Sequence, residues 1–326
     1  MSPPGGDRGL VTTDVGVALE RLRAGGLVAM PTETVYGLGA DAESATAVGR
    51  VFEVKGRPSD HPLIVHLGDA DQLSEWARTI PSAARVLATA CWPGPLTVLL
   101  ERGRRVLDVV TGGRPAVGIR VPSHPMTLEL LDRFGGGVAA PSANRFGRVS
   151  PTTAAHVVDD LAASLDPARD AILDGGPTPI GVESTIVDCT VDPPQILRPG
   201  GIPTEDIVRL LNGDVAEAAG PARSSGMLEA HYAPRCVVRL AESTEQAEQI
   251  AVALRRAGVD VDVLDGSADL VDMARTLYVE LRRADERALD VVVAVLPPAR
   301  GLGHAIRDRL TKASAGSGRS GPNRAG

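Results

Sequence analysis

Residues 236–264 read CVVRLAESTEQAEQIAVALRRAGVDVDVL, and this stretch decides the fold class. Its apolar runs at 236–240 and 259–264 are typical of buried strands, and the amphipathic stretch 244–257 between them predicts a helix. The alternation continues with a helix at 269–284, a strand at 289–295 and a helix at 302–311. This βαβαβα order predicts a small open parallel sheet with helices on both faces, a Rossmann-like domain at 236–313.

The sequence before this domain mixes strand and helix patterns less regularly. We expect strands at 26–30, 63–67, 137–140 and 184–188, and helices at 44–55, 125–134 and 153–165. That mixture is typical of an α/β domain, which we place at 13–212. Glycine and proline clusters predict an interdomain linker at 213–235. We expect disorder at 1–12 and 314–326.

Composition excludes several classes of protein. No apolar run approaches the roughly 20 residues that span a bilayer, and the N-terminus lacks the pattern of an export signal. The three cysteines, Cys91, Cys189 and Cys236, form no CxxC pair, which fits a reducing, cytoplasmic compartment. A net charge of −7 argues against broad nonspecific binding of nucleic acid.

Lys55 is unusual because the chain has 34 Lys and Arg residues and only Lys55 and Lys312 are lysines. On the predicted helix 44–55 it shares the apolar stripe with Val48, Val51 and Phe52. Gly56 suits the end of that helix, and Arg57 follows it. Two cations at the rim of a core-facing helix favour a phosphate-like anion, and a compact ammonium differs there from a guanidinium. The alternative is that the helix dipole alone stabilises both charges.

Other loops are also candidate sites. Ser142 and Asn144 follow the strand 137–140, at the carboxyl end where open α/β sheets bind ligands, although a simple turn is an equal alternative. Residues 37–42 match GxGxxA, but six residues separate them from the preceding strand, so we interpret them as a tight turn rather than a dinucleotide site. His66 lies near the end of the strand 63–67, where a lone histidine is more often a core residue than a ligand.

Neither a P-loop nor a metal-binding motif is present in the sequence. GxxxxGK[ST] and HExxH are both missing, and the six histidines are scattered. We therefore predict no protein metal site, and we expect any Mg²⁺ to be held by substrate phosphates and water.

Several of these segments together resemble the YrdC-like family. The resemblance covers about residues 15–212 and rests on six motifs, namely Pro31–Gly39, Lys55–Pro58, Pro62–His66, Trp92–Thr97, Pro141–Asn144 and Glu183–Asp188. Residues 225–234 and the domain after them resemble the long, two-domain form of that family. The resemblance implies a twisted open mixed sheet for the first domain.

The resemblance also implies an activity. It is the synthesis of threonylcarbamoyl-AMP and pyrophosphate from L-threonine, bicarbonate and ATP, a nucleotidyl transfer that needs no protein nucleophile. A partner enzyme then transfers the threonylcarbamoyl group to the adenosine at position 37 of tRNA. Whether this chain contacts tRNA directly stays open. The family's ATP-binding positions are matched by Lys55, Arg57, His61, Ser142, Asn144, Ser150, Arg198 and Tyr232, with Lys55 and Arg57 also catalytic. Its threonine-binding positions are matched by Thr34, His66, Arg120, Ala140 and Ser184.

The chain departs from the family pattern at three places. His61 replaces a usual asparagine, Ala116 a common threonine, and Ser225 the proline of a linker Pro-Gly. Two other functions are weighed against this one. One is a related carbamoyltransferase that makes carbamoyl-adenylate from carbamoyl phosphate, and the other is a noncatalytic RNA-binding module. The acidic balance and scarce aromatic residues disfavour the RNA-binding module.

Overall fold

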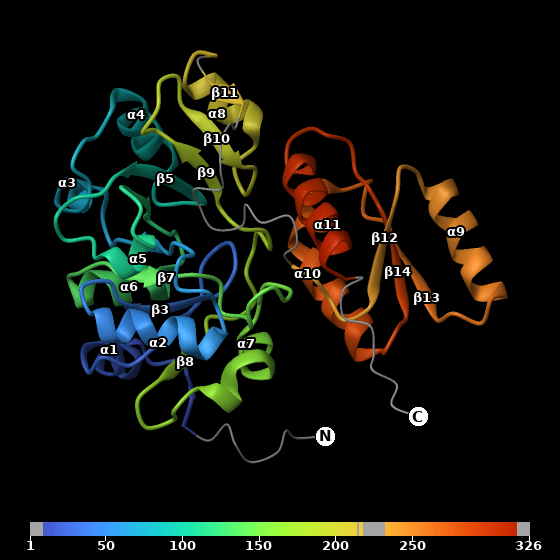
Figure 1. Ribbon diagram of the computed structural model, residues 1–326, viewed down its shortest axis with the longest axis horizontal. Coiled ribbons are helices and arrows are strands. Elements are labelled where there is room, and N and C mark those ends of the chain that lie inside the picture. Colours follow the sequence, from blue (N-terminus) through green and yellow to red (C-terminus); the bar gives the residue numbers. More distant parts are fainter. Residues whose placement is uncertain (1–8, 214, 218–231, 318–326) are drawn as a thin grey trace. The chain divides into compact units, whose positions relative to one another are not determined.

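The computed structural model describes residues 9–213, 215–217 and 232–317 (Figure 1). The chain divides into two compact units. The first comprises Met1–Phe146 and Ser150–Met227, and the second Gly147–Val149 and Leu228–Gly326. No helix in the described part of the chain is long and apolar enough to cross a membrane.

One 11-stranded mixed sheet forms the framework of the first unit. Its strands, in spatial order, are β1 (Val11–Thr12), β8 (Ala171–Leu173), β2 (Val28–Met30), β3 (Gly37–Asp41), β7 (Val138–Ala140), β4 (Ile64–His66), β6 (Ala116–Arg120), β5 (Leu96–Glu101), β9 (Thr185–Asp188), β10 (Gln195–Arg198) and β11 (Ala216–Glu217). At its centre β4 pairs parallel with β6 and antiparallel with β7, and β5 pairs antiparallel with β6 and parallel with β9. The predicted mixed sheet is confirmed. β1 lies within residues that we expected to be disordered.

Capping residues set the ends of helix α2 (Ala45–Lys55), one of the eight α-helices in the described part of this unit. These helices are α1 (Val15–Arg23), α2, α3 (Leu73–Trp76), α4 (Ser82–Cys91), α5 (Asp108–Thr111), α6 (Pro125–Phe134), α7 (Ala154–Leu161) and α8 (Thr204–Leu210), with short 3₁₀ turns at Ala70–Gln72 and Ala162–Ser164. Ser44 caps α2 by accepting from the backbone N–H of Ala47, and Gly56 ends it at φ 63°, in the left-handed region that favours glycine. Lys55 is therefore fixed at the last turn, as predicted.

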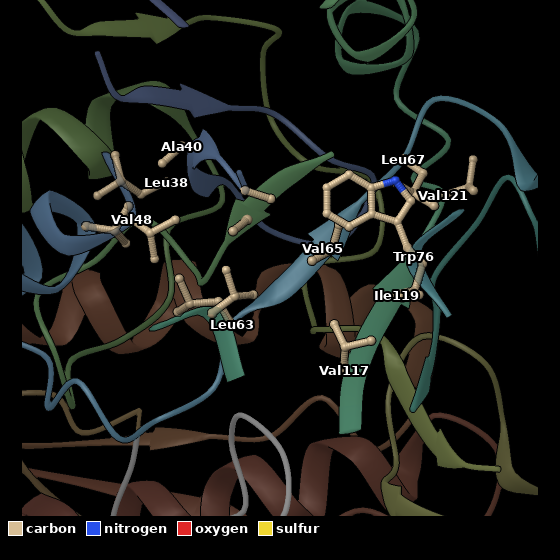
Figure 2. Packing of buried hydrophobic residues seen from close by; sticks show 14 of the residues in the cluster. Leu38, Ala40, Val48, Leu63, Val65, Leu67, Trp76, Val117, Ile119 and Val121 are labelled. Carbon is tan, nitrogen blue, oxygen red and sulfur yellow. The ribbon is translucent and has the colours of Figure 1, made fainter. Parts of the chain in front are cut away.

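Apolar side chains pack on both faces of the sheet, because successive strand residues point to opposite sides. On one face, Leu38, Val65 and Ile119 pack with Val48 of α2 and with the indole of Trp76 (Figure 2). The opposite face carries a second cluster, in which α1 and α6 cover β2 and β7, with Val28, Leu130, Leu131 and Val138 among its members.

The predicted tight turn at 37–42 is wrong, because Gly37–Asp41 form strand β3 between β2 and β7. The glycines serve close packing rather than a turn. A Cβ added at Gly39 would lie 2.6 Å from Cγ1 of Val138, so a larger residue would push the two strands apart. A strand of small residues lacks the β-branched signal on which the prediction relied.

The second unit contains a three-stranded parallel sheet in the order β12-β14-β13. Its elements are β12 (Val237–Ala241), α9 (Thr244–Arg256), β13 (Val261–Leu264), α10 (Leu270–Glu286), β14 (Val291–Val295) and α11 (Gly303–Ser317). Within this unit α9 covers one face of the sheet and α10 and α11 the other (Figure 1). The predicted Rossmann-like alternation is confirmed.

Helix α11 runs six residues past its predicted end at Thr311, into the expected tail. The extension is packed, because Ala313 and Ser317 are buried and Oγ of Ser317 accepts a hydrogen bond from the N–H of Val238 at 2.9 Å. Most of the expected linker, including Ser225, lies outside the described residues.

Candidate active site

A row of polar side chains crosses the centre of the large sheet on one face. His66 of β4 pairs with Arg120 of β6, and the register of Val98 with Ile119 places Thr97 of β5 next to Arg120. All three residues are buried in the described structure. Buried polar groups at the middle of a sheet are costly unless they are hydrogen-bonded, so their partners define what the row can bind.

Arg120 is already paired with a carboxylate of the chain. Its Nη2 donates to Oε1 of Glu33 at 2.6 Å and its Nε to the carbonyl of Gly94 at 3.3 Å. Oε2 of Glu33 accepts from the N–H of Ser123 at 3.0 Å. Burial, the largest influence, raises the pKa of Glu33, but the Arg120 charge and these hydrogen bonds outweigh it and leave that pKa lowered. A guanidinium has five hydrogens, so three remain on Arg120 for a ligand.

Glu33 is a residue of the candidate site that the sequence prediction missed. Arg120 was expected to bind threonine, and the chain itself places a carboxylate beside it. The available signal was an acidic residue between Thr32 and Thr34, three positions after the apolar strand 26–30. An acidic side chain that close to the core is rarely buried unless it is paired with a cation.

His66 lies beside Arg120 as a neutral ring. Burial first, and the Arg120 charge second, lower its pKa to about 3, although the carbonyls of Ile64 and Val138 partly oppose them. Its Nδ1 lies 3.1 Å from the carbonyl oxygen of Ile64. A neutral ring that donates from Nδ1 leaves Nε2 as an acceptor.

Ser184 and Arg198 were predicted to bind different substrates, and the structure brings them into contact. Arg198 donates from Nη2 to Oγ of Ser184 at 3.0 Å, and from Nε and Nη2 to its carbonyl at 3.1 and 2.8 Å. Oγ of Ser184 also lies 2.8 Å from Oγ1 of Thr97. Ser184 therefore joins the polar row through Thr97.

Thr34 is oriented by its neighbour Thr32. Oγ1 of Thr32 donates to the carbonyl of Val35 at 2.6 Å, and the two threonine hydroxyls lie 2.8 Å apart. Since Thr32 has used its hydrogen, Thr34 donates to it. The lone pairs of Thr34 are then available to accept from an ammonium or a hydroxyl.

Lys55 does not point into solvent. It is 3% exposed, and its Nζ donates to the carbonyl of Ser142 at 2.6 Å and to that of Asn144. Burial, and secondly the charge of Arg57, lower its pKa well below the usual value. The lysine therefore fastens the end of α2 to the Ser-x-Asn turn and keeps one hydrogen for a ligand.

The remaining residues predicted to bind ATP lie in three separate places. Arg57 and His61 lie beside the ring of Phe146, at 5.8 and 5.3 Å, near Lys55. Ser150 is fully buried, and its Oγ donates to Oε1 of Glu183 at 2.6 Å. Tyr232 belongs to the second unit, where its ring stacks on that of Tyr278 at 5.7 Å and lies under the guanidinium of Arg309 at 5.5 Å.

The segment 34–37 connects the polar row with the cationic turn, which consists of Lys55 and its partners Ser142 and Asn144. The carbonyl of Tyr36 accepts from the N–H of Ala143, Gly37 bridges to Ser142, and the N–H of Tyr36 donates to the carbonyl of Pro151. Ala140 ends β7 two residues before Ser142, next to Ile64 of β4. The two groups of predicted residues in the first unit are therefore parts of one hydrogen-bonded framework.

The polar side chains around Lys55 are the Arg57 guanidinium, the Ser142 hydroxyl, which donates to Oδ1 of Asn144, and the Asn144 amide. The described residues contain no group of three or more His, Cys, Asp or Glu that could hold a metal ion. Cations and neutral donors bind phosphate, whereas Mg²⁺ needs oxygen ligands that phosphate and water can supply. A mixed α/β sheet with such a cluster favours an anion-binding α/β enzyme.

Comparison with known proteins identifies the family. The protein-family model described as "Telomere recombination" matches residues 20–200, and the one described as "Threonylcarbamoyl-AMP synthase, C-terminal domain" matches residues 202–315. The chain belongs to the threonylcarbamoyl-AMP synthase family, in its two-domain form, and the resemblance stated from the motifs is confirmed.

Relatives match nearly the whole chain. A threonylcarbamoyl-AMP synthase of Pyrococcus abyssi is 40% identical over 321 residues, which cover 91% of this chain and 93% of the relative. One of Bacillus subtilis is 40% identical over 319 residues, which cover 90% and 91%. The crystal structure of P. abyssi Sua5 complexed with L-threonine superposes with a TM-score of 0.88 at 38% identity, covering 94% of this chain and 98% of that one.

Proposed function

We propose that this chain forms threonylcarbamoyl-AMP and pyrophosphate from L-threonine, bicarbonate and ATP. The observation that carries the proposal is the joining of two kinds of site in one framework. One is a cationic turn built from Lys55, Ser142 and Asn144, and the other is a buried polar row around Arg120. The similarity to a relative whose crystal structure contains L-threonine supports the amino-acid site.

The chemistry needs alignment and charge compensation rather than a nucleophilic side chain. The amine of threonine attacks the carbon of bicarbonate, water is lost, and a carbamate forms. A carbamate oxygen then attacks the α-phosphorus of ATP, and pyrophosphate leaves. Both reactants are anionic, so fixed positive charge is required to bring them together in line.

The cationic turn supplies that charge where the pyrophosphate leaves. Lys55 is held by two carbonyl oxygens, so little reorganisation is needed when its remaining hydrogen meets a phosphate oxygen. Arg57 adds a second cation beside it, and the Ser142 hydroxyl orients the Asn144 amide by donating to its Oδ1 at 2.5 Å. When Mg²⁺ is bound with ATP, it neutralises phosphate charge, and phosphates and water hold it.

The polar row binds the amino acid. Arg120 and Ser184 hold the carboxylate, and Thr34 accepts from the amine or the side-chain hydroxyl. His66 contacts threonine as a neutral acceptor, and Ala140 lines the pocket. Glu33 compensates the positive charge of Arg120. The carboxylate of threonine is therefore held by directed hydrogen bonds more than by net charge.

The product is a mixed anhydride, which is reactive toward water. A second enzyme must therefore take it up and transfer the threonylcarbamoyl group to the adenosine at position 37 of tRNA. We place the reaction in the cytoplasm, where ATP and tRNA are present. Ser150 and Arg198 support the nucleotide side of the site.

The test is pyrophosphate release from ATP with each substrate omitted in turn. Release should require both L-threonine and bicarbonate. Release supported by carbamoyl phosphate instead would favour the carbamoyltransferase. Salt-dependent tRNA binding without turnover of ATP would favour the RNA-binding module.

A further inference from the structure

Two buried hydroxyl groups in the polar row share one hydrogen bond. Oγ of Ser184 lies 2.8 Å from Oγ1 of Thr97, and either oxygen can be the donor. Thr97 is fully buried and Ser184 is 1% exposed. Among the described residues, the Thr97 hydroxyl has no other hydrogen bond. One of the two hydroxyl hydrogens is therefore always without an acceptor in the protein.

Arg198 decides which arrangement suits a ligand. Its guanidinium only donates, and its Nη2 gives a hydrogen bond to Oγ of Ser184 at 3.0 Å. If Thr97 also donates to Ser184, both lone pairs of Ser184 are occupied. The Ser184 hydrogen is then directed away from both partners and requires an acceptor from outside the chain. In the opposite arrangement the leftover hydrogen belongs to Thr97, which is fully buried, so an unmet donor there is costly.

The neighbouring residue shows which acceptor fits. The antiparallel register of β5 and β6 places Thr97 opposite Arg120, and Arg120 keeps three hydrogens beyond its bonds to Glu33 and Gly94. A carboxylate accepts from both a guanidinium and a hydroxyl. We propose that Thr97 is a positioning residue, which donates to Ser184 and thereby fixes Ser184 as a donor to the carboxylate of the amino acid. This inference rests on the proposed function.

The test compares Thr97→Val, which keeps the shape and removes the hydroxyl, with Thr97→Ser, which keeps the hydroxyl. Calorimetry with L-threonine should give a Kd that Thr97→Val raises about 3–10-fold, the effect of one hydrogen bond. Thr97→Ser should stay within about 2-fold of wild type, since it restores the donor. KM for ATP should not change in either variant. If Thr97 had a purely structural role, its loss would weaken the binding of both L-threonine and ATP.

A double-mutant cycle then tests the route of the effect. Ser184→Ala should raise the Kd for L-threonine, and adding Thr97→Val to it should raise the Kd no further, because Thr97 acts through Ser184. If Thr97→Val fails to fold, Thr97→Ala takes its place in the cycle.

Three outcomes would overturn the inference. They are an unchanged Kd in Thr97→Val, equal losses in Thr97→Val and Thr97→Ser, and fully additive losses with Ser184→Ala. In each of these cases wild-type activity with threonine leaves the proposed function standing. A wild-type protein that does not bind L-threonine would instead overturn the proposed function, and the inference with it.

Discussion

Replacing Lys55 by methionine should separate catalysis from stability. The ammonium is 3% exposed and donates to the carbonyls of Ser142 and Asn144. Methionine has a similar length and fills the same space without charge or donors. The substitution therefore removes the cation that we assign to the departing pyrophosphate while leaving the packing of α2 largely in place.

The expected effect of Lys55→Met on the free energy of unfolding is small, whereas its expected effect on kcat is large. Each lost hydrogen bond from a charged group destabilises by about 1.5–3 kcal/mol. Taking a buried ammonium out of the core offsets this, since burying such an ion costs several kcal/mol. We expect the free energy of unfolding to change by less than about 2 kcal/mol. Loss of a preorganised electrostatic contact to a transition state should lower kcat by about 10²–10³-fold.

Chemical denaturation measures the stability of Lys55→Met, and pyrophosphate release measures its kcat. Lys312→Met, at the only other lysine, is the matched control and should keep full activity, because Lys312 pairs with Asp308 in the second unit. Lys55→Arg should also be slow, since a planar fork does not fit the two carbonyls as a point charge does. If Lys55→Met turned over within about 3-fold of wild type, the charge of Lys55 would have no catalytic role.

Further predictions concern stability at Glu33, Lys55 and Gly137. Glu33→Ala leaves the Arg120 charge buried without its partner and should cost about 3–5 kcal/mol, measured by denaturation. The folded pKa of Glu33 is lowered, so its contribution to stability is present above the unfolded pKa and is lost as pH falls through the folded one; Glu33→Gln should flatten that acid-side slope. The folded pKa of Lys55 is also lowered, so the unfolded state binds more protons between that pKa and the usual one near 10.5, and stability should rise with pH there in wild type but not in Lys55→Met. Gly137→Ala would place a Cβ 2.5 Å from the Trp76 ring and should lower stability by about 1–3 kcal/mol. Unchanged melting of Glu33→Ala or Gly137→Ala would contradict the corresponding contact, and an unchanged pH dependence of stability in Glu33→Gln or Lys55→Met would contradict the corresponding pKa shift.

Sequence predicted the elements whose signals are local. Helix α2 was predicted to within a residue because Ser44 supplies its cap and Gly56 its left-handed end. Strand β3 was mistaken for a turn because its glycines are explained by Val138, a residue 99 positions away from Gly39. Helix caps depend on neighbouring residues and can be predicted from them, whereas the close approach of strands depends on residues that are distant in the sequence.

The candidate site shows the same division. The position of Lys55 on a core-facing stripe could be predicted, but its partners are backbone carbonyls 87 and 89 residues away, which carry no side-chain signature. The pairing of Arg120 with Glu33 joins residues 87 positions apart and changes the charge of the proposed amino-acid site. A sequence shows which charges a chain has, and only the fold shows which of them neutralise one another.

The origin of the carbamoyl carbon tests the central claim most directly. The protein is supplied with ATP, L-threonine and ¹³C-labelled bicarbonate, and the nucleotide products are analysed by mass spectrometry. We predict an AMP-linked threonylcarbamoyl product that carries one labelled carbon, together with one pyrophosphate per product. An AMP-linked product without the label, or consumption of ATP without threonine in the product, would contradict the proposed reaction.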